Sequence, residues 1–500
     1  MAHTSDPVVY AAQRAAGVLL HPTSLPGRYG VGDLGDELTA FLDWAAGAGM
    51  RVWQTLPLNP PGYGHSPYGC LSSFAGNPLL ISPQRLLQDG LLPEEPIEAV
   101  PPFAHDHVEF DRVAEYKTRL LRIAFQNFHD ADALAAFADT HREWLEDFAL
   151  FMALKQHEQG APWWTWERRL AQREPRTLEK ARGELASEVA FQKFVQFLFC
   201  RQWDAVREAA AARGIRVFGD VPIYVAHDSA DVWANRELFQ LDERGAPTVV
   251  AGVPPDYFSA TGQRWGNPLY RWDAMRERDF DWWVSRVKAN LRLADFIRLD
   301  HFRGFAAYWE IPANEPTAVH GRWMPGPGAA LFDALRDALG GELPLVAEDL
   351  GFITPEVHEL RHAIGVPGMK ILQFGFGQTD SPHLPHRYER ETVVYTGTHD
   401  NDTARGWFTA ADDDERRMAA AYLGIDDEDA VAPAMIRAAY TSVAQMAIVP
   451  AQDILGLGSE GRMNRPGAER DNWSWRLRAG ALTVEHGAAL HRLALITGRL

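Results

Sequence analysis

The stretch Phe296-Ile297-Arg298-Leu299-Asp300-His301-Phe302 is a short, largely apolar run that carries an acidic residue near its end. Runs this short, bounded by polar turns, are typical of strands buried on both faces of a parallel sheet. Seven further runs of similar character recur along the chain. They are Gly17–Leu20, Arg51–Leu58, Ile215–Val225, Leu343–Gly351, Met369–Phe376, Thr392–Asp400 and Met446–Leu457. Eight buried strands separated by helix-like segments predict an α/β fold, a (β/α)8 TIM barrel.

Two of the connections between these runs are too long for a single crossover helix. Residues 59–214 predict a mostly helical insertion, with apolar residues at helical spacing over His141–His157 and Leu185–Arg213. Residues 226–295 predict a smaller insertion, with a hairpin over Leu238–Val250 and then a loop rich in glycine and proline. No low-complexity linker flanks the first insertion, so residues 1–500 are interpreted as one barrel unit with decorations.

Composition narrows the class of partner. The 500 residues carry a formal net charge of −18, which disfavours nucleic acid and anionic lipid surfaces and suits a neutral substrate. The only two cysteines form no C-x-x-C pair, Met1–Val9 does not resemble a signal peptide, and no run of apolar residues is long enough to span a membrane. We therefore expect a cytoplasmic protein. The 17 tryptophans are compatible with sugar stacking and with simple core filling.

Four of the predicted strands deliver an acidic residue at the end where barrel enzymes do their chemistry: Asp220, Asp300, Glu348 and Asp400. Each has a structural alternative when taken alone. Asp300 could pair with a neighbouring arginine, and Asp400 with His399 could cap the next helix. Four such residues on four strands, all at the same end, favour an active site, because carboxylates at the mouth of an apolar barrel are costly to desolvate.

Two kinds of chemistry could use these acids. Neighbouring Asp and His residues resemble metal ligands, but adjacent residues on a strand point to opposite faces, so we expect no metal and no cofactor. Glycosidic chemistry instead needs one ionised and one protonated carboxylate. Arg298, on the same face as Asp300, would keep that aspartate charged, and Asp349 or Asp400 would help Glu348 to hold a proton. Asp400 would then contact the hydroxyls of the sugar.

Several motifs resemble the signatures of the amylomaltases, the 4-α-glucanotransferases of glycoside hydrolase family 77. The most diagnostic is Val250–Ser259 continued by Gly262–Pro268. The others are His21–Gly27, Gly62–Tyr68, Arg298–Gly304, Ala347–Gly351, Thr398–Asp402, Ser459–Asn464 and Asn472–Trp475. The resemblance runs from about Gly17 to the C-terminus. It implies an enzyme that moves segments of α-1,4-glucans, with no β-sandwich after the barrel.

The resemblance also implies roles for individual residues. Asp300 would be the nucleophile, Glu348 the general acid/base and Asp400 the transition-state stabiliser. The residues implied to contact substrate are Asp220, Arg298 and His399 in the donor site, Tyr68 near the scissile bond, Trp265 and Tyr257 on a covering loop over residues 251–268, and Tyr63 in a secondary glucan patch. A buried loop anchor is the alternative for Trp265, and an ordinary turn aromatic is the alternative for Tyr63. Cys70 and Arg465 depart from the family pattern near the site.

The implied substrates are maltooligosaccharides, amylose or starch and glycogen-derived α-glucans, with glucose as an acceptor. Retaining cleavage leaves a glucosyl ester on the nucleophile, which water or a sugar can attack. Transfer therefore requires a cover that excludes water, for which the composition of the 251–268 loop is suited. Two other functions stay open: an α-glucan hydrolase on the same barrel, and a glucan-binding protein without catalysis.

Overall fold

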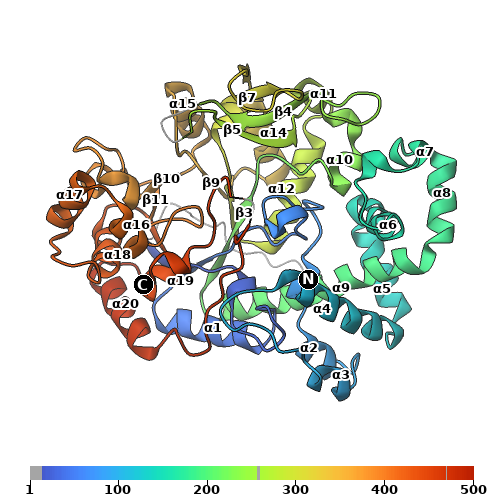
Figure 1. Ribbon diagram of the computed structural model, residues 1–500, viewed down its shortest axis with the longest axis horizontal. Helices are drawn as coiled ribbons and strands as arrows, with labels where there is room; N and C mark the ends of the chain where they lie inside the picture. The colour runs from blue at the N-terminus through green and yellow to red at the C-terminus, as the bar shows by residue number, and fades with distance from the viewer. Residues whose placement is uncertain (1–13, 256–258, 469) are drawn as a thin grey trace.

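The computed structural model, drawn in Figure 1, describes residues 14–255, 259–468 and 470–500. All eight predicted strands are present in it. The strands are β1 Ala15–Leu19, β2 Val52–Gln54, β3 Arg216–Val221, β6 Phe296–Leu299, β9 Leu345–Ala347, β10 Gly368–Ile371, β11 Thr392–Tyr395 and β12 Met446–Pro450. They form one parallel sheet in the order β10-β11-β12-β1-β2-β3-β6-β9. A hydrogen bond of 2.9 Å from Ala347 N to Pro367 O joins its two ends. The prediction of a (β/α)8 barrel is confirmed.

Alternate residues of each strand serve two separate cores, which explains why the strands read as continuous apolar runs. Phe218 and Phe296 belong to the cluster inside the barrel, where their rings stack with centroids 4.4 Å apart. Their neighbours Val217 and Ile297 belong to the outer cluster, against which the helices pack. A barrel filled by inward side chains in this way is a solid core rather than a pore.

The chain between β2 and β3 is mainly helical and forms the flank at the right of Figure 1. Its α-helices are α2 Pro83–Gln88, α3 Glu94–Glu98, α4 Phe110–Gln126, α5 Ala131–Thr140, α6 Arg142–His157, α7 Arg168–Ala171, α8 Pro175–Glu184 and α9 Ala186–Ala212. The two helices expected from apolar spacing correspond to α6 and α9. The α9 helix ends just before Gly214, whose φ of +68° suits the glycine that follows a helix.

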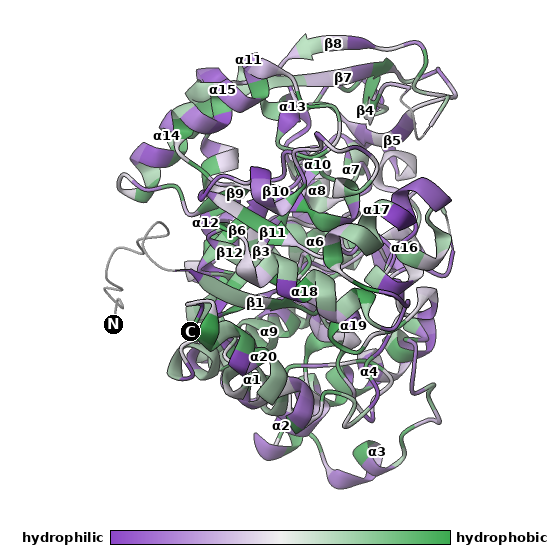
Figure 2. Ribbon diagram, turned by 90° about the vertical axis from the view of Figure 1, so that its left-hand side faces the viewer, coloured by the Kyte–Doolittle hydropathy of each residue, from purple (hydrophilic) through white to green (hydrophobic). Residues whose placement is uncertain are grey.

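A second sheet lies beyond the carboxyl ends of β3 and β6, at the top of Figure 2. Its antiparallel strands, in the order β5-β4-β7-β8, are β4 Val249–Val253, β5 Gln263–Pro268, β7 Ala307–Pro312 and β8 Arg322–Pro325. The hairpin expected over Leu238–Val250 is only a single bridge between Leu241 and Pro247. The pairing ends because Gln240 N donates to Leu269 O at 2.8 Å rather than across the hairpin, and β4 pairs with β5 and β7 instead.

The remaining helices follow the barrel strands or extend their connections. They are α1 Asp36–Gly47, α10 Ala230–Ala234, α11 Trp272–Glu277, α12 Asp281–Leu293, α13 Arg303–Ala306, α14 Ala329–Leu339, α15 Pro355–Ile364, α16 Ala404–Ala410, α17 Asp413–Leu423, α18 Val431–Thr441, α19 Ala451–Ile454 and α20 Val484–Ile496. Five tryptophans are fully buried and fill the core: Trp53, Trp163, Trp203, Trp233 and Trp283. Within the described residues, none of the helices has the length and apolar character needed to cross a bilayer.

Arg499 ties the C-terminal end of the chain to the bottom of the barrel. Its side chain is fully buried and donates to backbone carbonyls at the end of α18 and at the start of β1, including Tyr440 O at 2.8 Å, Ala444 O at 2.9 Å and Ala15 O at 3.2 Å. These carbonyls lie where a helix ends and a strand begins, so few backbone donors reach them.

We expect Arg499→Met to lower the free energy of unfolding by about 3 kcal/mol, because it removes the buried hydrogen bonds of this guanidinium to backbone carbonyls, some of which it shares with Arg14. A urea unfolding curve followed by circular dichroism would measure the loss. Arg492→Met, on the exposed face of α20, is the matched control and should unfold like the wild type. Equal curves for both variants would show that the Arg499 contacts do not stabilise the fold.

Candidate active site

Arg298 joins two aspartates at the carboxyl end of the barrel. The register of β3 and β6 sets Asp220 beside Arg298. The Nη1 atom of Arg298 lies 2.9 and 2.7 Å from the two carboxylate oxygens of Asp220, and its Nη2 atom lies 2.7 Å from Asp300 Oδ1. One guanidinium thus holds two acids in fixed positions. It can do so because its planar group presents several N–H donors in a rigid geometry that matches carboxylates.

The two aspartates differ in their exposure. The Asp220 side chain is fully buried, whereas 28% of the Asp300 side chain is exposed. Burial raises the pKa of Asp220, and the charge of Asp300 adds to that rise, while Arg298 opposes it. Burial works against the charge of Arg298, but Asp220 and Asp300 outweigh it and raise the pKa of the guanidinium further. Arg298 is therefore a permanent cation at the base of the site, and Asp300 is the more accessible of the two aspartates.

Glu348 lies next to Asp300 because both follow strand ends that are neighbours in the sheet. Glu348 N donates to Leu299 O at 3.0 Å. Its carboxylate accepts from His301 N at 2.6 Å and from Leu350 N at 3.1 Å. The backbone N–H groups of His301 and Leu350 therefore fix the carboxyl group of Glu348 next to His301, the residue after Asp300.

The environment of Glu348 favours its protonated form. Burial raises the pKa of Glu348 well above its usual range, and the nearby charge of Asp300 contributes to the rise, while Arg298 opposes it. The expected helper Asp349 contributes less than Asp300. Asp349 instead accepts a hydrogen bond from Met369 N at 2.7 Å and pairs with Arg361 at 3.2 Å. A carboxyl group with a raised pKa can supply a proton near neutral pH.

His399 and Asp400 both belong to the site, although they are adjacent in sequence. The alternation of side chains along a strand does not apply to them, because β11 ends at Tyr395 and both lie on the loop beyond it. His399 is buried, and its Nε2 atom lies 3.4 Å from Asp400 Oδ2. Burial lowers the pKa of His399. Asp400 Oδ1 accepts a hydrogen bond of 2.6 Å from Asn464 Nδ2.

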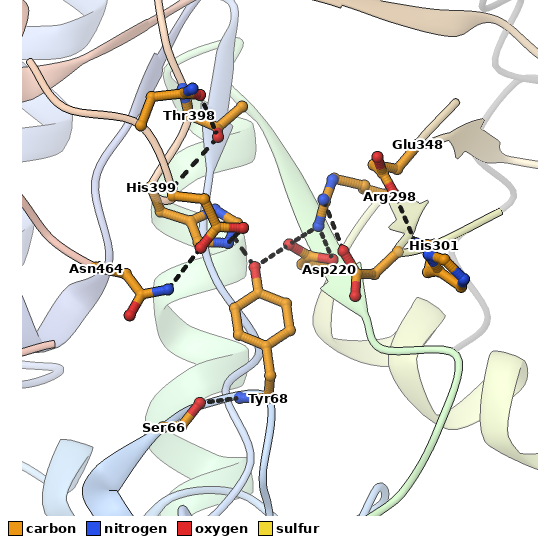
Figure 3. A network of polar contacts seen from close by, with 12 residues as sticks. Ser66, Tyr68, Asp220, Arg298, His301, Glu348, Thr398, His399 and Asn464 are labelled. Carbon is orange, nitrogen blue, oxygen red and sulfur yellow. Dashed lines mark hydrogen bonds and ion pairs between the residues drawn. The ribbon is translucent and has the colours of Figure 1, made fainter. Parts of the chain in front are cut away.

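Tyr68 connects the two halves of the site, as Figure 3 shows. Its hydroxyl donates to Asp220 Oδ2 at 2.7 Å and lies 3.4 Å from His399 Nδ1. The rings of Tyr68 and His399 stack with centroids 4.9 Å apart. Through Tyr68 and Arg298, the acids on the β3, β6 and β9 side are linked to those on the β11 side.

The other predicted residues lie at the edge of this cluster or apart from it. Trp265, on β5, is 38% exposed and contacts the ring of His301 edge-on with centroids 4.8 Å apart, so it is not a buried anchor. Tyr63 is 95% exposed, and within the described part of the chain it makes no hydrogen bond to the acids. Tyr257 falls outside the described residues.

The loop after β12 supplies residues that sequence reasoning did not single out. Asn464 reaches Asp400, and Trp473 packs against Tyr68 and His399 with ring centroids 5.7 and 5.9 Å apart. Both residues lie in motifs that resemble the family signatures, and this resemblance was the sequence feature that could have indicated a place in the site. Nothing in those motifs says which acid the side chains would meet.

The chemical character of the site follows from this arrangement. Three acids from different strands face one region, with a fixed cation beside one of them and a raised pKa on another. Among the described residues, no group of three or more His, Cys, Asp or Glu side chains is arranged to hold a metal ion. Paired carboxyl groups in opposite environments at the mouth of a TIM barrel are the arrangement that enzymes acting on glycosidic bonds require.

Comparison with known proteins narrows this class. The family model described as 4-alpha-glucanotransferase matches residues 20–483. The chain therefore belongs to the 4-alpha-glucanotransferase family, glycoside hydrolase family 77, whose members are glycosyltransferases acting on α-1,4-glucans.

Relatives and solved structures agree over nearly the whole chain. A 4-alpha-glucanotransferase of Thermus thermophilus is 51% identical over 501 residues, covering 97% of this chain and 99% of the relative. One from Synechocystis is 50% identical over 473 residues, covering 93% of this chain and 94% of the relative. The amylomaltase of Streptococcus agalactiae, solved in complex with acarbose, superposes with a TM-score of 0.95 at 37% identity, covering 97% of this chain and 100% of that one.

Proposed function

We propose that this chain transfers a segment of an α-1,4-glucan to the 4-hydroxyl of glucose or of another α-1,4-glucan by a retaining double displacement. Asp300 is the nucleophile, Glu348 the general acid/base and Asp400 the stabiliser of the transition state. The observation that carries the proposal is the contrast between two adjacent carboxyl groups. Asp300 is ion-paired with Arg298 and open to ligand, whereas burial raises the pKa of Glu348.

In the first step, the Asp300 carboxylate attacks the anomeric carbon. The glycosidic C–O bond breaks, and Glu348 gives its proton to the departing oxygen, so a covalent glycosyl ester forms on Asp300. The cation of Arg298 supports this step because it orients the attacking carboxylate. Arg298 also keeps Asp220 in place as a partner for the sugar.

In the second step, the ionised Glu348 takes the proton from the 4-hydroxyl of the acceptor, whose oxygen attacks the anomeric carbon and releases Asp300. The same glutamate thus serves as acid and then as base. Asp400, with 47% of its side chain exposed, can accept hydrogen bonds from ring hydroxyls as positive charge develops on the sugar.

The residues proposed to bind substrate surround these acids. They are Asp220, Arg298, His399 and Tyr68 around the donor sugar, Trp265 and Tyr257 on the covering loop, and Tyr63 at a secondary glucan contact. The exposed face of Trp265, next to His301, supports sugar stacking at the rim. The acarbose bound to the Streptococcus agalactiae amylomaltase supports a maltooligosaccharide-like ligand. Amylose, starch and glycogen-derived glucans are the longer substrates, and glucose is an acceptor.

Transfer over hydrolysis depends on a cover that excludes water. We assign this cover to the loop over residues 251–268, within the insertion of residues 226–295, while the helical insertion of residues 59–214 carries Tyr68 to the site. The antiparallel pairing of Gly252 with Arg264 supports the loop as a hairpin rather than an open segment. The protein is proposed to act as one barrel unit in the cytoplasm, where its two free cysteines suit a reducing environment.

Incubation of the purified protein with maltotriose tests this function. Transfer yields glucose together with maltooligosaccharides longer than maltotriose, which chromatography with pulsed amperometric detection separates. Products restricted to glucose and maltose would instead support the alternative, an α-glucan hydrolase. No turnover of any α-glucan would contradict both.

A further inference from the structure

The segment 459–464, after β12, is fastened to the loop that carries His399 and Asp400. Ser459 Oγ donates to Asp402 Oδ2 at 2.7 Å, and Asn464 N donates to His399 O at 3.1 Å. Arg462 Nη2 donates to Asp400 O at 2.9 Å. In the part of the chain that the structure describes, the contact from this segment to the Asp400 carboxylate itself is the bond of 2.6 Å from Asn464 Nδ2 to Oδ1.

We propose that Asn464 is a positioning residue for Asp400: its carboxamide fixes the rotation of that carboxylate, so that the free oxygen lone pairs point at the hydroxyls of the sugar. The inference rests on the proposed function, in which Asp400 stabilises the transition state. Within the described residues, the Asn464 carboxamide donates to the Asp400 carboxylate, so its proposed effect on the reaction passes through Asp400.

Asp400 needs such a partner more than the other acids do. Arg298 holds Asp220 and Asp300, and two backbone N–H groups hold Glu348. Asp400 is the most exposed of these acids, with 47% of its side chain accessible, and it lies on a loop rather than on a strand. Its other side-chain neighbour, His399 Nε2, is 3.4 Å from Oδ2, so the shorter bond to Asn464 is the stronger restraint.

Asn464 is itself held rigidly enough to act in this way. It is 9% exposed, its backbone N–H is bonded to His399, and its carbonyl accepts from Arg462 Nε at 2.8 Å. A pocket borders this segment and is lined by Thr398, Asp402 and Arg462 among others. Hydrogen bonds from Ser459, Arg462 and Asn464 join the two loops beside it.

Loss of the carboxamide should therefore act on the transition state rather than on ground-state binding. An Asp400 carboxylate free to rotate still allows the sugar to bind, but it is misaligned when charge develops. Misplacement of a group by about 1 Å can cost 10²-fold in rate. We expect Asn464→Ala to lower kcat roughly 10- to 100-fold with a much smaller change in KM.

Asn464→Asp gives the sharper readout, because it keeps the shape of the side chain and replaces the donor with a second carboxylate. Two carboxylates in such contact share a proton at low pH. We therefore expect the acidic limb of the kcat profile to move to higher pH in Asn464→Asp but not in Asn464→Ala. A purely structural role of residue 464 would not move the pH profile.

The experiment measures kcat and KM for maltotriose disproportionation from pH 4 to 9, with melting curves for each variant. Ser459→Ala is the matched control, since it removes a bond of the same segment to Asp402 and leaves the Asp400 carboxylate untouched. It should keep kcat and the pH profile of the wild type. If the Asn464 variants also keep both, or if Ser459→Ala loses activity as much as Asn464→Ala does, the inference is overturned.

Asp400→Asn separates this failure from failure of the proposed function. An inactive Asp400→Asn enzyme beside fully active Asn464 variants would overturn only the positioning role. Wild-type activity in Asp400→Asn would remove the role of Asp400, and with it both the inference and that part of the proposed function.

Discussion

Asp300→Asn is expected to lower the rate of maltotriose disproportionation by roughly 10⁴-fold or more, because removal of an essential nucleophile has effects of that size. An amide cannot form the glycosyl ester, and it also leaves Arg298 Nη2 without its charged partner. Glucose release in a coupled assay measures the loss. Binding of acarbose, followed by tryptophan fluorescence, should persist, since Asn has nearly the same shape as Asp.

Asp295→Asn is a matched control for this variant. Asp295 directly precedes β6, at the opposite end of the strand from Asp300, and it pairs with Arg207 at 2.7 Å. Its replacement can lower stability, but it should leave kcat close to that of the wild type. A fully active Asp300→Asn enzyme, or an Asp295→Asn enzyme that loses kcat equally while folded, would contradict the role given to Asp300.

Glu348→Gln is expected to lower turnover of maltotriose by roughly 10²- to 10⁴-fold, because its sugar leaving group needs a proton. An α-maltosyl fluoride donor should lose far less in the first step, since fluoride departs without one. Burial holds the pKa of Glu348 above its usual range. The acid is therefore protonated below that pKa, and the wild-type rate should fall as pH rises through it.

The pH profile supplies the control for this second prediction. Glu348→Gln should lack the alkaline fall of the wild type, because glutamine does not titrate. Glu342→Gln, at an exposed position shortly before β9, should keep both the rate and the profile of the wild type. An unchanged alkaline limb in Glu348→Gln would assign that titration to another group.

The barrel could be predicted from sequence because a buried parallel strand leaves a local trace. Val217 and Phe218 are adjacent and both apolar, since the side chain of Phe218 faces the barrel interior and that of Val217 faces the helices. The second sheet could not be predicted in the same way. Its strands β4 and β7 pair with each other although barrel strand β6 lies between them in the sequence. Their pairing therefore depends on the folding of the barrel, which brings them together.

The residues of the site likewise fall into those that local sequence predicts and those that it does not. Asp300 and Glu348 could be named as candidates because each follows a predicted strand directly. The bridge by Tyr68 from Asp220 to His399 joins residues more than 150 positions apart and leaves no local pattern. Asn464 is similar, because only the folded loops show that it meets Asp400. Strand ends predict where the chemistry lies, whereas the supporting contacts come from loop conformation.

The central claim is a covalent glycosyl ester on Asp300, and peptide mapping by mass spectrometry tests it most directly. Glu348→Gln enzyme is mixed with α-maltosyl fluoride, which forms the ester but leaves no base to activate the acceptor that would release it. After acid quench and pepsin digestion, the account predicts a maltosyl adduct on the peptide that contains Asp300. An adduct on a different carboxylate, or turnover of the fluoride with no adduct at any time, would contradict it.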